Sequence, residues 1–425
     1  MAVRSIGLAR LGDAERLGWP APDPSACRRD GESVGERGGV VPRVAFFFNA
    51  QAHQLLHGIT IAEQLALGWQ AHVDILSSTQ INLDLARATT LPDHQRRLHF
   101  ERVGSRLARA VAAWTGRVVP PKLLTLLAAR RILNGYDAIA LPERTSILLR
   151  SLGVTRPRFI HVDHGAGDRA AGFDPRIARF DFALLAGEKQ RRRMLDDGLI
   201  REGHYAIVGY PKFDAADRLR DESWSPFATE RPIILYNPHF SPTLGSWASH
   251  GFDIARHIVE SGRYNLVIAP HIRLCDSRSG RAAAEAVFGP FAALPQVHLD
   301  LGSERSIDMT YTRMADLYLG DVSSQVYEFL RHPRPCLFVN GDGRSWLGDP
   351  NHDHWRFGPV VDAAHDIVPA IERAMATHGD YAAIQAAAFD DTFDVRRGES
   401  SSRRAAAAIA GFLALAPRLV PSRGD

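Results

Sequence analysis

Residues 159–169 read FIHVDHGAGDR, an apolar run that stops abruptly on histidines, aspartates and glycines. A strand buried on both faces of a parallel sheet is a short apolar run, and ligands of such sheets lie beyond the carboxyl ends of the strands. The stretch therefore predicts a strand with His164 at the rim of a sheet. Gly165, which has no side chain, allows backbone N–H groups to approach a ligand.

The two histidines of this stretch are expected to differ. A neutral imidazole can accept a proton from a hydroxyl group at neutral pH, which makes His164 a candidate general base. The alternative is a tight turn with a hydrogen-bonded structural histidine. His161 alternates with the rim position along the strand, and is therefore expected to point inward.

Further strand-then-loop units surround this stretch, and helical patterns separate several of them. The expected strands lie at 43–48, 72–78, 136–143, 180–188 and 205–211. A helix is expected at 57–69, and a long helical region precedes the strand at 136–143. This alternation is typical of a doubly wound α/β domain.

A polar segment with two prolines, residues 218–232, separates this series from a second one. Strands are expected there at 233–240, 265–273, 297–301, 317–320 and 335–343, with helices at 251–262, 368–376 and 401–416. The predicted fold class is α/β, with two Rossmann-like domains facing a cleft. The expected divisions are a mobile leader at 1–42, domains at 43–217 and 233–404 joined by the linker 218–232, and a C-terminal helix and tail at 405–425.

Composition limits the function classes. The net charge of +3 over 425 residues is too small to indicate nucleic-acid binding, although it is compatible with anionic substrates or an anionic membrane surface. Cys27, Cys275 and Cys336 are far apart and indicate neither a disulfide framework nor a zinc knuckle. Without a signal-peptide pattern or an apolar membrane-spanning run, we expect a cytoplasmic protein, at most peripheral to a membrane.

A second polar motif ends the strand of residues 265–273, NLVIAPHIR. His271 and Arg273 are two residues apart, so in an extended segment they face the same side. Such a pair suits a phosphate, because arginine offers a fixed fork of donors. The alternative is a solvated loop.

A third motif, LYLGDVSSQVYEFL at 317–330, places Asp321, Ser323 and Ser324 where a strand gives way to a helix. Free N–H groups at a helix start can bind phosphate. The alternative is ordinary helix capping, for which one serine is enough.

Three weaker candidates complete the set. Asn237 and His239 lie in the loop after the strand at 233–240, and Lys212 follows the strand at 205–211. His352 and His354 are spaced as metal ligands can be, but no third ligand is in reach by sequence. We therefore expect neither a metal nor a cofactor.

Taken together, these motifs resemble the CDP-glycerol glycerophosphotransferase family, whose polymerases and primases of teichoic acid type have a GT-B-like fold. The resemblance covers roughly residues 155–410 and keeps the family's order of motifs. The matching positions are His164-Gly165, Gly209 to Asp214, Tyr236 to Phe240, His271, Asp321 to Ser324, and Arg397 to Arg404. Two departures concern the loop after Pro238, which has His-Phe in place of Thr-Trp-Arg, and the Thr-Pro missing after Gly165.

The resemblance implies transfer of a polyol phosphate from a CDP-linked donor to a hydroxyl of a lipid-linked or polymeric glycan, with release of CMP. It implies that His164 and His271 are essential. In this interpretation the domain at 43–217 binds the acceptor and the domain at 233–404 binds the nucleotide donor. Gly165, Lys212, Asn237, His239, Arg273, Asp321, Ser323 and Ser324 are the expected substrate-binding residues.

Two alternatives stay open. The first is a sugar-nucleotide enzyme of the same fold, either a glycosyltransferase or a relative of UDP-N-acetylglucosamine 2-epimerase. The paired glutamates of a retaining GT-B enzyme are matched in spacing only by Glu222 and Glu230, which lie in the expected linker. The second is a nucleotide-binding relative without catalytic activity.

Overall fold

The computed structural model describes residues 41–116, 119–241, 243–362 and 364–418. The expected mobile leader, apart from residues 41 and 42, lies outside the described residues, as does the end of the tail at 419–425. No helix within the described ranges is long and apolar enough to cross a lipid bilayer.

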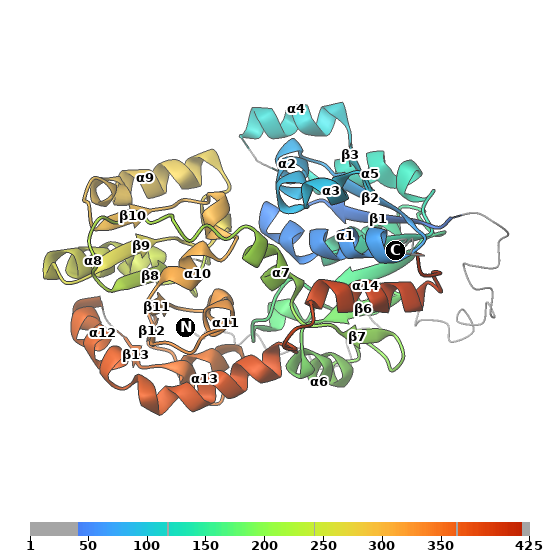
Figure 1. The fold of residues 1–425 in the computed structure, drawn as a ribbon. Coiled ribbons are helices and arrows are strands. Elements are labelled where there is room, and N and C mark those ends of the chain that lie inside the picture. Colours follow the sequence, from blue (N-terminus) through green and yellow to red (C-terminus); the bar gives the residue numbers. More distant parts are fainter. Residues whose placement is uncertain (1–40, 117–118, 242, 363, 419–425) are drawn as a thin grey trace, which may run out of the picture.

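Two all-parallel sheets organise the described residues (Figure 1), which confirms the predicted fold class. The first sheet has the order β3-β2-β1-β4-β5-β6-β7, and the second has the order β10-β9-β8-β11-β12-β13. Each sheet with its covering helices is called a domain here, the first and the second. The strands are β1 (Arg43–Phe48), β2 (His72–Ser77), β3 (Leu98–Arg102), β4 (Ala138–Leu141), β5 (Arg158–Val162), β6 (Phe182–Leu185), β7 (Tyr205–Ile207), β8 (Ile233–Asn237), β9 (Asn265–Ile268), β10 (Val297–Leu299), β11 (Leu317–Gly320), β12 (Cys336–Val339) and β13 (Val360–Val361).

Helices cover both faces of each sheet. They are α1 (Ile59–Gly68), α2 (Gln80–Thr89), α3 (Pro92–Gln95), α4 (Arg106–Thr115), α5 (Lys122–Leu133), α6 (Glu188–Asp196), α7 (Pro211–Arg218), α8 (Trp247–Ser261), α9 (Arg278–Ala292), α10 (Thr310–Met314), α11 (Gln325–Phe329), α12 (Ile367–Ala376), α13 (His378–Thr392) and α14 (Ser401–Phe412). Several short 3₁₀ helices lie in the loops, and η4 (Ala52–His57), η8 (Ile272–Leu274) and η10 (Pro350–Phe357) are used below.

The apolar run of β1 explains why the chain forms a central strand there. Alternate side chains of β1 enter two different cores: Phe46 packs with α1, α2 and α14, whereas Phe47 packs with α5. β1 pairs in parallel with β2 and β4. Because both faces of the sheet are buried, the strand must be apolar throughout, and the polar residues of the chain are left to the strand ends.

The strand β3 is absent from the sequence interpretation, which expects helix through this region. Its residues LHFER lie at the edge of the first sheet and pair only with β2. Leu98 is buried, but the neighbouring His99 is exposed. An edge strand with one covered face has no continuous apolar run. A search for continuous apolar runs therefore does not detect it.

The C-terminal helices return to the first domain. The chain crosses from the second domain through α13, which contacts α6, and ends in α14, which packs along α1 (Figure 1). The expected division between residues 404 and 405 falls inside α14, so α14 as a whole belongs with the first domain. The physical reason is its small apolar face, since Ala405, Ala406 and Ile409 are buried in the core that contains Phe46.

Candidate functional site

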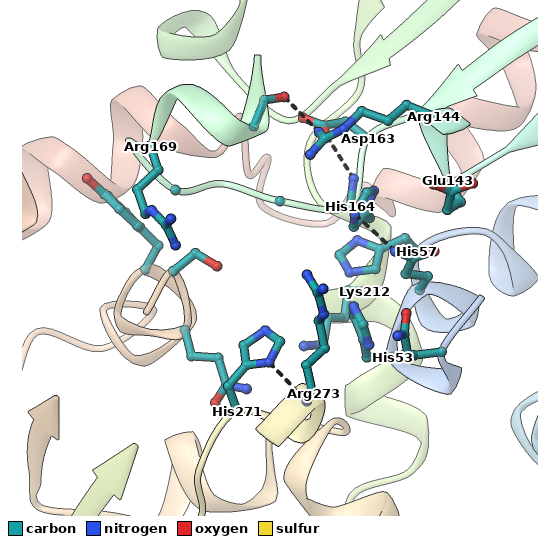
Figure 2. Close-up of a pocket in the computed structure, with 18 of the residues that line it drawn as sticks. His53, His57, Glu143, Arg144, Asp163, His164, Arg169, Lys212, His271 and Arg273 are labelled. Atoms are coloured by element: carbon teal, nitrogen blue, oxygen red, sulfur yellow. Dashed lines mark hydrogen bonds between the residues drawn. The ribbon is translucent and has the colours of Figure 1, made fainter. Parts of the chain in front are cut away.

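A pocket of about 530 Å³ lies between the carboxyl ends of the two sheets, and residues of both domains line it. We call it the interdomain pocket (Figure 2). Six lysine and arginine side chains and four carboxylates are among its described lining residues. The lining also includes His53, His57, His164, His239, His271 and His354.

His164 lines the interdomain pocket directly beyond β5, as its place in the sequence predicts. Its Nε2 lies 3.2 Å from Nε2 of Gln54, and its Nδ1 is buried without a hydrogen-bond partner among the described residues. Burial and the nearby Arg144 guanidinium lower the pKa of His164 to about 4. The ring is therefore neutral at neutral pH and keeps a lone pair that can accept a proton.

His161 lies inside the first domain, fully buried on β5, in agreement with its expected inward direction. The next polar residue, Asp163, accepts hydrogen bonds from the backbone N–H of His164, at 2.8 Å, and from the side-chain amide of Gln190. Burial raises the pKa of Asp163 to about 6. These hydrogen bonds of Asp163 stabilise the backbone of the turn that carries His164.

His271 and Arg273 line the interdomain pocket from the second domain, beyond β9. The His271 Nδ1 accepts a hydrogen bond from the backbone N–H of Arg273 at 3.2 Å, which fixes the ring at the start of η8. The Arg273 guanidinium lies 4.2 Å from the centre of the Phe240 ring, in cation–π geometry. Burial and Arg273 lower the pKa of His271 to about 4.

The His53 ring connects the two predicted histidines. Its centre lies 6.4 Å from that of His164 and 6.3 Å from that of His271. His57, on the same 3₁₀ helix η4, lies 6.3 Å from His164. Imidazoles of the two domains therefore share one hollow.

His239 also reaches the interdomain pocket, and it meets a cation there. Its Nε2 lies 2.7 Å from Nη1 of Arg169, a residue of the first domain, and its Nδ1 accepts from the backbone N–H of Ser241 at 3.1 Å. Burial and the Arg169 charge lower the pKa of His239 to about 3.

Lys212 lines the interdomain pocket but has a carboxylate partner across the domains. Its Nζ lies 2.7 and 2.8 Å from the two carboxylate oxygens of Glu328, which also accepts from the Tyr210 hydroxyl at 3.0 Å. Both members of the Lys212–Glu328 pair are buried. This pair joins α7 to α11, so its first role is to hold the domains together.

Three of the predicted substrate-binding residues are not brought into the interdomain pocket. The buried Asp321 carboxylate accepts from the backbone N–H groups of His239 at 2.9 Å and Ser246 at 2.7 Å. Asn237 is buried between Ala269 and Tyr318, and Ser323 is buried as well. Asn237, Asp321 and Ser323 support the loops that carry other lining residues.

Ser324 and Gly165 do line the interdomain pocket, from opposite domains. Ser324 is exposed, and its side chain makes no cap to α11, a helix of five residues. Gly167 explains why the 165–169 turn is rich in glycine: a Cβ there would lie 2.8 Å from Cβ of Ser324. A residue with a side chain at 167 would push the turn away from the second domain.

Two other motifs of the resemblance pair with each other away from the interdomain pocket. The Asp214 carboxylate accepts from the hydroxyl of Ser400 at 2.8 Å, the backbone N–H of Ser402 at 2.7 Å and the hydroxyl of Ser402 at 2.6 Å. This contact attaches the start of α14 to α7. Asp214, Ser400 and Ser402 of these motifs are therefore structural in this chain, whereas Tyr210 and Lys212 of the first motif line the interdomain pocket.

His352 and His354 have separate partners. His352 Nδ1 lies 2.8 Å from a carboxylate oxygen of Asp349, whereas His354 Nδ1 lies 2.9 Å from one of Asp168. Within the described ranges, no group of three or more histidine, cysteine, aspartate or glutamate side chains is arranged to hold a metal ion.

The sequence interpretation missed the polar side chains of η4 and the end of the 165–169 turn: His53, Gln54, His57 and Arg169. A signal was present, because the polar stretch AHQLLH begins only a few residues after the end of β1 at Phe48. Its spacing fits neither a strand nor an amphipathic helix, so it reads as a connection. Lys122 and Glu143, whose charged groups lie 2.6 Å apart, complete the lining that was not predicted.

No protein-family model and no curated protein sequence matches the chain. Solved structures of similar fold do exist. S. aureus MnaA in complex with UDP superposes with a TM-score of 0.59 at 12% identity, over 88% of this chain and 97% of that chain. The wall teichoic acid polymerase TagF gives 0.58 at 11% identity, over 87% and 88%.

A third similar structure is the UDP-GlcNAc 2-epimerase from Neisseria meningitidis bound to UDP-GlcNAc, with a TM-score of 0.55 at 11% identity, over 88% of this chain and 99% of that chain. At such low identities the likeness shows the fold alone. The chain has the two-domain, GT-B-like fold that these proteins share.

Proposed function

We propose that this protein is a transferase that moves glycerol phosphate, or a related polyol phosphate, from a CDP-linked donor to an acceptor hydroxyl, with release of CMP. The observation that carries the proposal is the convergence of His164 and His271, from opposite domains, on one basic pocket. These are the two histidines that the family resemblance makes essential.

In the proposed reaction the acceptor oxygen attacks the phosphorus next to the polyol. Its O–H proton passes to the neutral His164 ring, a new O–P bond forms, and the P–O bond to CMP breaks, so that CMP leaves with the electron pair. His271 and Arg273 stabilise the negative charge on the transferring or the leaving phosphate. Phosphoryl transfer depends mainly on such positioned charge, which a pocket rich in cations supplies.

The state of the carboxylates favours imidazole-based chemistry. Every carboxylate among the described lining residues has a partner: Glu143 has Lys122, Glu328 has Lys212, and Asp168 has His354. Asp163 accepts the hydrogen bonds described above. The exposed Glu222 and Glu230 are not among the lining residues. The neutral imidazole of His164 is thus the group best suited to accept a proton.

Fold similarity to UDP-GlcNAc 2-epimerase favours a second candidate, an enzyme acting on a UDP-sugar. Incubation of the protein with CDP-glycerol, CDP-ribitol or UDP-GlcNAc, each with a lipid-linked glycan and a short polyol-phosphate oligomer as acceptors, separates the candidates. Chromatography of the nucleotides is expected to show CMP from a CDP-linked donor, with growth of an acceptor.

Release of UDP, or an epimerised UDP-sugar, would replace the proposal by the second candidate. Nucleotide binding without turnover of any donor would favour the relative without catalytic activity. Neither result is compatible with the proposed phosphotransferase.

A lipid-linked acceptor implies contact with the cytoplasmic face of a membrane, and we propose the surface of α4 and α5 for it. Leu107 and Trp114 of α4 are 63% and 88% exposed. Exposed Arg106, Arg130 and Arg131 lie on the same two helices, and α4 lies at the outer edge of the first domain (Figure 1). Apolar side chains with neighbouring cations bind anionic lipid surfaces.

Sedimentation with lipid vesicles tests this surface. The protein is expected to sediment with vesicles of anionic phospholipid and less with vesicles of phosphatidylcholine. The double variant Leu107→Asp, Trp114→Asp should stay in the supernatant, whereas Phe252→Ser, a change to an exposed apolar residue of α8, should sediment like the wild type. Equal sedimentation of the double variant and the wild type would exclude α4 as the contact.

A further inference from the structure

Arg169 is a cation of the interdomain pocket without an acidic partner among the described residues. Its side chain is half-buried, and among the described residues its polar contact is with the His239 ring at 2.7 Å. Burial lowers the pKa of Arg169, and the charge of Asp321 offsets this effect only in part. A guanidinium in such a place is suited to an anionic ligand, because a buried charge without a counter-charge is costly.

The contact between Arg169 and His239 is itself incomplete. The His239 Nδ1 accepts the Ser241 N–H, so the proton of the neutral ring belongs on Nε2, the atom that faces the Arg169 Nη1. Two N–H donors then face each other, which is unfavourable. An oxyanion that moves the two groups apart and accepts a hydrogen bond from both removes the conflict.

The turn that carries Arg169 is held against the second domain on both sides of this residue. On one side, Asp168 accepts from the Tyr327 hydroxyl at 2.6 Å and lies 2.9 Å from Nδ1 of His354. On the other side, the Ala170 N–H donates to the Asn351 side chain at 2.8 Å. Arg169 is therefore fixed in direction although it belongs to the first domain, and little conformational entropy is lost when it binds a ligand.

Arg273 faces the same hollow from the second domain, and Figure 2 shows the two arginine side chains extending into it from different parts of the chain. Arg273 contacts the Phe240 ring, and it too has no carboxylate partner in the part of the chain that the structure describes. Both guanidinium charges act on the rings of His239 and His271 and contribute to their lowered pKa values. The four groups thus surround one region of the interdomain pocket.

We propose that Arg169 and Arg273 form a two-sided clamp for the diphosphate of a nucleoside diphosphate-linked substrate. Arg273, from the second domain, binds near the nucleoside, and Arg169, from the first domain, binds the distal phosphate. The inference rests on the proposed function. It adds a binding residue, Arg169, that the family motifs did not predict. It also makes the donor a bridge between the domains.

Isothermal titration with CDP and CMP tests the clamp, because the two ligands differ by the distal phosphate. Arg169→Met is expected to weaken binding of CDP by at least about tenfold and to leave binding of CMP nearly unchanged, since a hydrogen bond to a charged group is lost only with CDP. Arg169→Lys should recover part of the CDP affinity, because it keeps the charge without the planar fork.

Arg256→Met is the matched control, since Arg256 pairs with surface acids of α8 outside the interdomain pocket. Its CDP and CMP affinities should equal those of the wild type. Thermal unfolding of each variant shows whether Arg169 is needed for folding, and the ratio of CDP to CMP affinity stays informative in any variant that folds.

An unchanged ratio in Arg169→Met, an equal loss for CDP and CMP, or a wild type that binds no nucleoside diphosphate would each overturn the clamp. UDP and UMP form a parallel pair of ligands. If UDP binds and CDP does not, the proposed CDP-linked donor is wrong, but the ratio of UDP to UMP affinity still tests Arg169. The clamp and the proposed function can therefore fail separately.

Discussion

The two domains present different kinds of polar side chain to the interdomain pocket. On the first domain, His53, His57 and His164 each have an Nδ1 that is buried without a hydrogen-bond partner among the described residues. On the second domain, the Nδ1 atoms of His239 and His271 accept backbone N–H groups. Fewer hydrogen bonds therefore hold the rings of the first set, whereas the rings of the second set are fixed in direction, as binding groups must be.

Similar motifs at strand ends therefore serve different purposes in the two domains. The turn after β5 places His164 and Arg169 in the interdomain pocket, but the corresponding segment after β11 places Val322, Ser324 and Gln325 there and buries Asp321. The histidines of the first domain are therefore expected to control the rate of the chemical step. The second domain is expected to control the shape of the loops and, together with Arg169 of the first domain, the affinity.

The largest expected effect is that of His164→Ala. Loss of a positioned base should lower kcat by about 10²–10⁴-fold, with little change in KM for the donor. Steady-state kinetics with the donor that the nucleotide-release assay identifies provides the measurement. His99→Ala, a change to an exposed histidine of β3, is the control. Near-normal turnover of His164→Ala would place proton transfer elsewhere and remove the contrast between the domains.

Asp321→Ala should act on stability. Its carboxylate holds the N–H groups of His239, Ser246 and Val322, so we expect the free energy of unfolding in urea to fall by about 3 kcal/mol, because buried donors lose their acceptor.

Asp321→Asn keeps one acceptor oxygen and should recover part of this stability. A variant Asp321→Asn with wild-type stability but no nucleotide affinity would show that Asp321 binds the ligand after all.

The pH dependence of kcat/KM tests the protonation states of His164 and His271. Because His164 and His271 have pKa values of about 4, both rings are neutral well below the usual histidine range. The rate should stay level as the pH falls to about 5 and then decline by about tenfold per pH unit below the pKa of the base. A decline centred on the ordinary histidine value near 6.5 would contradict the buried, cationic environment of His164.

Asp163 provides a control for this profile, since burial raises its pKa to about 6. Any inflection near that pH that disappears in Asp163→Asn belongs to this carboxyl group and not to His164. Circular dichroism at each pH separates loss of activity from loss of fold.

The smallest expected effect is that of Ser324→Ala. The exposed Ser324 hydroxyl lines the interdomain pocket, so its removal should weaken nucleotide binding by about two- to fivefold without loss of stability. Ser323→Ala is the matched comparison, because the buried Ser323 should affect stability and leave affinity unchanged. The reverse pattern would assign the serine pair the opposite roles.

The apolar runs and their spacing are enough to predict the alternation of strands and helices, the two parallel sheets and the polar strand ends. Buried parallel strands such as β1 and β5 must be continuous apolar runs, so the transition to His164 or to His271 is visible without coordinates. The edge strand β3 was not predicted, because only part of it is buried and its sequence lacks a continuous apolar run.

Contacts between segments that are distant in the sequence determine which polar side chains enter the interdomain pocket. In a loop no fixed period sets the direction of a side chain. Asp321 is therefore buried, whereas Ser324, three residues later, lines the interdomain pocket. Arg169, His53 and His57 became part of the site because the domains close on each other, and contacts between distant segments, such as that of Asp168 with His354, leave no periodic trace in the sequence.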